Sequence, residues 1–166
     1  MRRLILFRHG QAVPHDRGPD RERSLTQTGR DDAGLIAKTL HESGIDPDIV
    51  LVSPATRTRE TWDCARVYFP YAVELITADL YLATPDIILA QLHRIEDNFK
   101  TLMIVGHNPA MHDVALTLYG YGDRYAFSRL RDEFPTSGCA VFDFDCETWS
   151  AVASNQGRLD RFLTPS

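Results

Sequence analysis

Residues 4–10 read LILFRHG, a run of four apolar residues followed by an arginine, a histidine and a glycine. A short apolar run that ends in polar residues is typical of a buried strand. In an open, mostly parallel sheet, ligands bind beyond the carboxyl ends of the strands, because loops and helix N-termini converge there. The stretch therefore predicts the first strand of an α/β fold, with Arg8 and His9 at a binding edge.

The rest of the chain repeats this alternation of apolar runs and segments with helical periodicity. Further strands are predicted at 49–52, 73–77 and 102–105, and helices at 26–43, 56–68, 85–95 and 109–118. CAVFDFD (139–145) and WSAVAS (149–154) predict two short closing strands arranged like a hairpin. HDRGPDRERS (15–24) and YGYGDRY (119–125) are interpreted as loops within the domain. We expect one domain over residues 1–166, a three-layer α/β sandwich whose central sheet is mostly parallel and has helices on both faces.

The composition excludes several classes of partner. A net charge of -5 and a pI near 5.6 argue against broad binding of nucleic acid or of anionic membranes, which requires a basic surface. Cys64, Cys139 and Cys146 form no C-x-x-C pair, so we expect small buried side chains and neither a disulfide framework nor structural zinc. The first apolar run is too short for a signal peptide, and no window resembles a membrane span, so we expect a cytoplasmic protein.

Three predicted strands end in residues that suit a phosphoryl group. Arg8 and His9 follow the first strand, Ser53 and Arg57 follow the second, and His107 follows the strand at 102–105. An arginine fork matches phosphate oxygens bidentately. A neutral imidazole can attack phosphorus, while a second one donates hydrogen bonds to the phosphoryl oxygens. Gly10 would allow a close approach of the backbone to the substrate, and Pro109 would leave a helix N-terminus free for an anion.

The motifs RHG (8–10), SPATRTRET (53–61) and VGHNP (105–109) occur in the order in which the histidine phosphatase superfamily has them. The chain resembles that superfamily over most of its length, including LTQTGRDDA (25–33). EFPTSGCAVFDF (133–144) is similar to the closing-strand region of the small SixA-type phosphohistidine phosphatases. The resemblance implies a phosphoglycerate mutase-like fold.

The resemblance also implies roles for individual residues. His9 would be the nucleophile, Arg8 and Arg57 the phosphate clamp, and His107 the second imidazole at the phosphoryl group. Arg23 and Ser53 rank below these four as additional substrate contacts. Arg59 is expected at the surface, and the other four histidines are expected outside the site (His15, His41, His93 and His112). No metal-binding motif is present, and two arginines would repel a divalent cation, so we expect no metal and no cofactor.

The stretch between Thr77 and Thr101 has room for about one helix, so we expect an open site that suits a phosphate displayed on a protein. Asp79 is interpreted either as a weakly placed general acid or as an exposed loop residue. As an acid it would matter more for an alkyl ester than for phosphohistidine, whose imidazole leaves readily. We therefore expect a metal-independent phosphatase that acts on a phosphohistidine-bearing protein. The alternatives are a phosphomonoesterase for a small metabolite and a module that binds phosphoryl groups without turnover.

Overall fold

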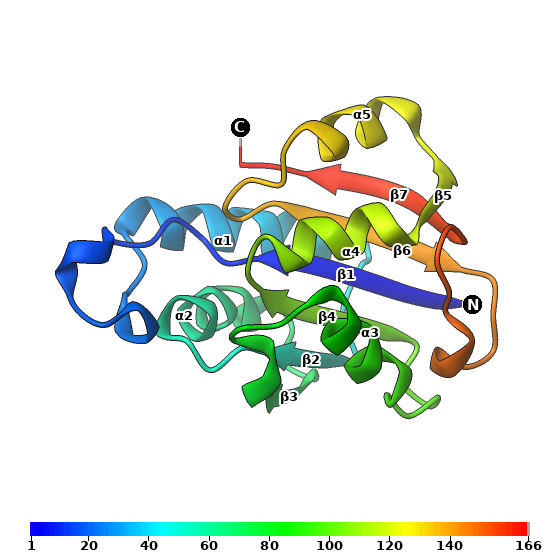
Figure 1. Ribbon diagram of the computed structural model, residues 1–166, viewed down its shortest axis with the longest axis horizontal. Helices are drawn as coiled ribbons and strands as arrows, with labels where there is room; N and C mark the ends of the chain where they lie inside the picture. The colour runs from blue at the N-terminus through cyan, green and yellow to red at the C-terminus, as the bar shows by residue number, and fades with distance from the viewer. Residues whose placement is uncertain (166) are drawn as a thin grey trace.

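A computed structural model describes residues 1–165, which form a central sheet between two layers of helices (Figure 1). The seven strands are β1 (Arg2–Arg8), β2 (Ile49–Val52), β3 (Val73–Ile76), β4 (Thr101–Gly106), β5 (Tyr119–Gly122), β6 (Cys139–Phe144) and β7 (Gly157–Leu163). Their order in the sheet is β3-β2-β4-β1-β6-β7-β5, and β6 runs antiparallel to both of its neighbours. The predicted fold class, an α/β sandwich with a mostly parallel sheet, is confirmed.

Four of the five helices lie where the sequence periodicity places them, and the fifth, at Arg124–Asp132, was not predicted. They are α1 (Gln27–Glu42), α2 (Thr56–Ala65), α3 (Pro85–His93), α4 (Ala110–Leu118) and α5 (Arg124–Asp132). Short 3-10 turns follow several of the other elements, at His15–Arg17, Asp20–Glu22, Arg66–Tyr68, Ala78–Leu80 and Trp149–Ala151. Thr26 caps α1 by accepting a hydrogen bond from the backbone N–H of Gly29 at 3.0 Å, as its position before the apolar stripe predicts.

Both faces of the central strands are buried because each face packs against its own helices. Leu4 and Leu6 of β1 point into a core shared with α3, α4 and α5. Ile5 and Phe7, the alternate residues, point into a second core shared with α1 and α2. This explains the uninterrupted apolar run at 4–7, since a strand buried on both faces has no polar alternation.

The closing strands differ from the sequence prediction. CAVFDFD does form β6, but WSAVAS forms no strand: Trp149–Ala151 is a 3-10 turn, and the partner of β6 is β7 at Gly157–Leu163. The Trp149 side chain is fully buried, and its indole N–H donates to the carbonyl oxygen of Phe99 at 2.7 Å. This anchor ties the segment to the connection before β4 and keeps it out of the sheet.

The predicted loop YGYGDRY is also wrong, because its first half is the edge strand β5 and its second half begins α5. A side chain at Gly120 would lie 2.2 Å from the backbone oxygen of Asn155, so only glycine permits this approach. Asp123 then caps α5 by accepting from the N–H of Ala126 at 2.9 Å. The glycines and the aspartate of this segment predicted a loop, whereas they belong to an edge strand and a helix N-cap.

The topology brings the predicted motifs to one edge. β1 and β4 are adjacent and parallel, and Arg8 lies opposite Gly106 in their register. His9 and His107 therefore follow the two strands side by side, and α2 begins next to them after β2. The segment between β1 and α1 extends beyond this edge, on the left in Figure 1. Within residues 1–165, no helix has the length and apolar character needed to cross a membrane.

Candidate active site

His9 is held so that one ring nitrogen is free. Its Nδ1 donates to the carbonyl oxygen of Gly10 at 2.7 Å, which leaves Nε2 without a proton. The ring is only 8% exposed. Burial first, and then the neighbouring His107, Arg8 and Arg57, lower the pKa of His9 to about 3, against the opposing effect of the hydrogen bond to the Gly10 carbonyl. His9 is therefore a neutral imidazole with an available lone pair at physiological pH.

His107 faces His9, with a distance of 5.4 Å between the ring centroids. Its Nε2 lies 2.7 Å from the hydroxyl oxygen of Ser53, which is fully buried and also accepts from the N–H of Ala55 at 3.4 Å. Among residues 1–165 this hydroxyl has no other hydrogen-bond acceptor, so we assign its hydrogen to Nε2 and the ring proton of His107 to Nδ1. Burial first and Arg57 second lower the pKa of His107 to about 4. His107 is a neutral donor whose Nδ1 is buried without a partner.

Arg8 is fixed by the loop that precedes β6. Its Nη1 donates to the carbonyl oxygen of Phe134 at 3.1 Å, and the side-chain amide of Asn108 donates to the same oxygen at 2.8 Å. The backbone N–H of Ser137 donates to the carbonyl oxygen of His9 at 2.9 Å. Residues 134–138 therefore hold both the arginine and the backbone of His9 in place.

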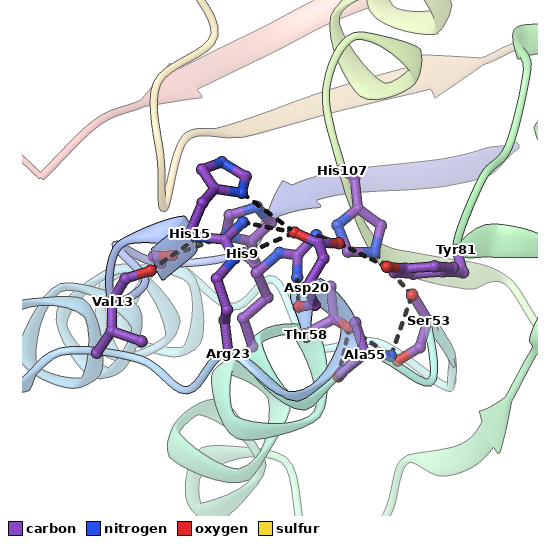
Figure 2. Close-up of polar contacts among 12 residues, drawn as sticks. His9, Val13, His15, Asp20, Arg23, Ser53, Ala55, Thr58, Tyr81 and His107 are labelled. Carbon is purple, nitrogen blue, oxygen red and sulfur yellow. Dashed lines mark hydrogen bonds and ion pairs between the residues drawn. The ribbon is translucent and has the colours of Figure 1, made fainter. Parts of the chain in front are cut away.

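Arg57 enters from the first turn of α2 and is 6% exposed. Its Nη1 donates to the backbone carbonyl of Asp20 at 2.8 Å, and its Nη2 donates to the Asp20 carboxylate at 3.2 Å. Arg23 reaches the same carboxylate through Nε at 3.1 Å and Nη2 at 2.9 Å. Asp20 thus links the arginine predicted for the clamp to the arginine predicted as an additional contact, as Figure 2 shows for Asp20 and Arg23.

Three buried nitrogens that converge on this region lack a partner among the described residues: Nε of Arg8, Nε of Arg57 and Nδ1 of His107. A buried donor without a partner is costly, and native structures rarely keep one without a reason. All three are donors, and two belong to guanidinium groups, so an anion satisfies them best. Together with the free Nε2 of His9, they can bind a phosphoryl group and attack it.

Several expectations from the sequence concern residues that the structure places differently. Ser53 contacts His107 and no solvent, so it supports an imidazole from behind and does not line the site. Gly10 approaches the protein itself: a Cβ there would lie 2.6 Å from the backbone oxygen of Gly29. Asp79 is exposed, and its carboxylate accepts from the side-chain amide of Gln91 at 3.3 Å. This contact favours the interpretation of Asp79 as a loop residue.

The remaining histidines lie away from the site or at its rim. His93 contacts the carbonyl oxygen of Val152, His112 contacts that of Leu130, and His41 contacts Asp46. His15 is an exposed residue whose Nδ1 lies 3.6 Å from Asp20. Among residues 1–165, no group of three or more histidine, cysteine, aspartate or glutamate side chains is arranged to hold a metal ion.

Asp20 and Tyr81 are site residues that sequence reasoning missed. The Tyr81 hydroxyl donates to the Asp20 carboxylate at 2.5 Å, and the Tyr81 ring packs edge-on against His107 with 5.8 Å between centroids. Asp20 precedes Arg23 by three residues, a spacing that suits an ion pair. That signal was present, but the alternating charges of the loop suggested a solvated segment. Tyr81 carried no signal, because its role depends on how the chain returns after β3.

Comparisons with known proteins identify the family and the fold. Residues 4–77 match the model of the histidine phosphatase superfamily (branch 1). The uncharacterized protein Rv1276c of Mycobacterium tuberculosis is 34% identical over 163 residues, which are 96% of this chain and 99% of that protein. A structure from Nakamurella multipartitia, assigned as a phosphohistidine phosphatase SixA, superposes with a TM-score of 0.87 at 26% identity, over 99% of this chain and 96% of that one.

A second structure with the same assignment, from Agrobacterium tumefaciens, gives a TM-score of 0.83 at 28% identity, over 99% of this chain and 98% of that one. A strand-end site with two imidazoles and two guanidinium groups has a set of donors that suits a phosphoryl group. The chain belongs to the histidine phosphatase superfamily, with the phosphoglycerate mutase-like fold and the SixA type of architecture.

Proposed function

We propose that this protein is a phosphatase that removes the phosphoryl group from phosphohistidine on a protein, through a covalent intermediate on His9. The tautomer of His9 is the main support for His9 as the nucleophile. The hydrogen bond from its Nδ1 to the Gly10 carbonyl leaves Nε2 free beside two arginines. A neutral imidazole needs no base before it attacks phosphorus.

In the first step, the lone pair of His9 Nε2 forms a bond to phosphorus as the bond from phosphorus to the substrate nitrogen breaks. Arg8, Arg57 and the Nδ1–H of His107 donate to the equatorial oxygens, where charge accumulates. A substrate imidazole that is protonated on its other nitrogen leaves as a neutral ring. His9 now carries the phosphoryl group on Nε2 and still holds its proton on Nδ1.

In the second step, water attacks phosphorus and the bond to His9 Nε2 breaks. The water protons pass to phosphate oxygens and to solvent, so the product is inorganic phosphate. The phosphorylated ring, which carries a positive charge, departs with the electron pair and becomes the neutral imidazole again, with its proton still on Nδ1 in the hydrogen bond to Gly10. The same tautomer therefore serves attack and departure, and neither step requires a separate acid for His9.

The choice of substrate rests on the lack of an available proton in Tyr81, which packs against His107, and in Asp20, its hydrogen-bond partner. The Tyr81 hydrogen bond, with help from Arg23 and Arg57, holds the pKa of Asp20 below its usual range. The same hydrogen bond raises the pKa of Tyr81. Asp20 is ionised and the Tyr81 hydroxyl donates its proton to Asp20, so neither group is free to protonate a departing alkoxide, whereas imidazole leaves without that help. This favours a phosphoramidate over an alkyl ester.

The test is to trap the intermediate. The protein is mixed with a substrate carrying labelled phosphate and quenched in alkali, where phosphohistidine survives and phosphoserine is lost. We expect one acid-labile label on His9, no label on a folded His9→Ala variant, and no effect of EDTA on turnover. Binding without label transfer would show that the protein only holds phosphoryl groups. An EDTA-sensitive rate would contradict the metal-independent mechanism.

A further inference from the structure

The carboxylate of Asp20 lies at the junction of three parts of the chain. One oxygen accepts the two hydrogen bonds from Arg23, and the other accepts from Arg57 and from the Tyr81 hydroxyl. In Figure 2, Asp20 lies between Arg23 and Tyr81, with dashed lines to both. The segment between β1 and α1, the start of α2 and the turn after β3 are thus joined through a single acidic group.

The way Arg57 is held decides what Asp20 does. A guanidinium group has an outer edge with both Nη atoms and an inner edge that includes Nε. Asp20 takes the outer edge of Arg57, with its backbone carbonyl on Nη1 and its carboxylate on Nη2. The Nε of Arg57 is buried and has no hydrogen-bond partner among residues 1–165. The edge that includes Nε is therefore the one that Asp20 leaves for a phosphoryl oxygen.

Two interpretations of this carboxylate make opposite predictions. If the carboxylate occupied the phosphate position, it would accept hydrogen bonds from the nitrogens that we assign to phosphate binding. The substrate would then have to displace it. Asp20 contacts neither the Nε of Arg8 nor the Nδ1 of His107, both of which are buried and unpartnered. Asp20 therefore leaves these two donors unsatisfied among residues 1–165, as a supporting group would and a phosphate mimic would not.

We propose that Asp20 is the positioning residue of the phosphoryl clamp: it orients Arg57 and Arg23 through the hydrogen bonds that it accepts from them, and the Tyr81 hydroxyl holds Asp20 in that orientation. This inference rests on the proposed phosphoryl site. Its physical basis is that a guanidinium on a flexible stem donates two aligned hydrogen bonds to phosphate only when its other edge is fixed. Tyr81 also packs against His107, so the same phenol contacts both halves of the site.

The first experiment is a double-mutant cycle on kcat/KM for a phosphohistidine peptide. Asp20→Asn keeps the shape of the side chain and removes its charge, and we expect a loss of about tenfold to a hundredfold. In an Arg57→Ala background the same change should cost no more than about threefold, the part transmitted through Arg23. Tyr81→Phe should cost about threefold alone and nothing further when combined with Asp20→Asn. Asp16→Asn, an exposed carboxylate in the same segment, is the matched control and should retain wild-type activity.

Equal losses from Asp20→Asn in the wild-type and Arg57→Ala backgrounds would overturn the proposal, because Asp20 would then act independently of the clamp. If turnover of Arg57→Ala is too slow to follow, the cycle is run on the dissociation constant of tungstate instead. A role in stability alone would lower the melting temperature of Asp20→Asn without this coupling to Arg57, and that result would also overturn it.

The second experiment measures tungstate binding by calorimetry at about 0.5 M KCl, where loss of a nearby negative charge has little long-range effect. We expect Asp20→Asn to bind tungstate about tenfold more weakly than the wild type. Tighter binding would show that Asp20 competes with the anion, which contradicts the positioning role. No binding by the wild-type protein would instead contradict the phosphoryl site itself, so the two failures are distinguishable.

Discussion

A hydrogen bond of 2.7 Å joins the Ser53 hydroxyl to Nε2 of His107, on the side of the ring that faces the protein interior. Because Nε2 accepts this bond, the proton of the neutral ring stays on Nδ1, the nitrogen left without a partner. Without the hydroxyl, His107 would be free to carry its proton on Nε2, and that tautomer cannot donate from Nδ1. Ser53 thus controls which nitrogen of His107 can contact a phosphoryl oxygen.

Replacing Ser53 by alanine should therefore lower kcat about tenfold, since roughly one hydrogen bond to the transition state, or about 1.4 kcal/mol, is lost. The KM should change little, because the arginines still bind the ground state. Ser150→Ala, at an exposed serine, is the control. Nitrogen NMR of labelled histidine reports the tautomer directly, and a His107 that keeps its proton on Nδ1 in Ser53→Ala would contradict this account.

Arg57→Lys should be nearly as damaging to kcat/KM as Arg57→Ala. An ammonium group is a point charge that cannot donate to Asp20 through one edge and to phosphate through the other. We expect losses of at least about a hundredfold for both variants, measured on the same substrate. Arg59→Lys, on an exposed residue two positions further along α2, is the matched control. A lysine variant that kept most of the wild-type rate would show that charge alone suffices at this position.

The sequence predicted those parts of the site that depend on neighbouring residues. Arg8 and His9 follow a strand buried on both faces, and His107 follows the strand paired with it, so topology alone brings them together. Asp20 and Tyr81 could not be placed in this way, because their hydrogen bond joins residues 61 positions apart through two irregular segments. Local sequence patterns predict where strands end, but they do not predict which loop residues will contact those strand ends.

The same limit explains the misplaced closing strand. WSAVAS alternates as a strand does, yet the indole of Trp149 is held by the carbonyl oxygen of Phe99, about fifty residues earlier. The turn residues of YGYGDRY indicate a loop when they are considered alone. They form β5 because Gly120 and Gly122 allow the backbone of β7 and the turn before it to come close. In both cases a distant contact overrode the local preference.

The burial of His9 predicts how stability depends on pH. An unfolded histidine takes up a proton near pH 6.5, but folded His9 resists protonation down to about pH 3. Between these values the unfolded chain binds more protons, so the free energy of unfolding falls as the pH falls below about 6.5. From pH 6.5 to about 4.5 the contribution of His9 to this loss is about 2 kcal/mol.

Urea denaturation at the two pH values should show a smaller loss for His9→Gln than for the wild type. Carbon NMR of labelled His9 should show no titration between about pH 5 and 8. Because His9 and His107 face each other, the steps observed at lower pH belong to the pair. A His9 ring that titrates near 6.5 would show that the free site holds a protonated imidazole, and the neutral nucleophile would then have to form only after substrate binds.

The last prediction concerns Asp79 and the leaving group. Its carboxylate is exposed and accepts from Gln91 of α3, and within residues 1–165 it forms no hydrogen bond or ion pair with His9, His107, Arg8 or Arg57. A general acid must reach the oxygen that it protonates, directly or through one water. We therefore expect Asp79→Asn to change the rates on a phosphohistidine peptide and on an alkyl phosphate by less than about twofold each.

Without a general acid, the rate should depend steeply on the leaving group. The phosphohistidine peptide should exceed an alkyl phosphate in kcat/KM by roughly 10² to 10⁴, the usual contribution of general acid catalysis. An aryl phosphate such as 4-nitrophenyl phosphate, whose phenolate leaves unaided, should fall between the two. Suppose instead that Asp79→Asn slows the alkyl ester selectively. Asp79 would then reach the leaving oxygen in the complex, the site would contain an acid suited to esters, and the chemical reason for preferring a phosphohistidine substrate would be lost.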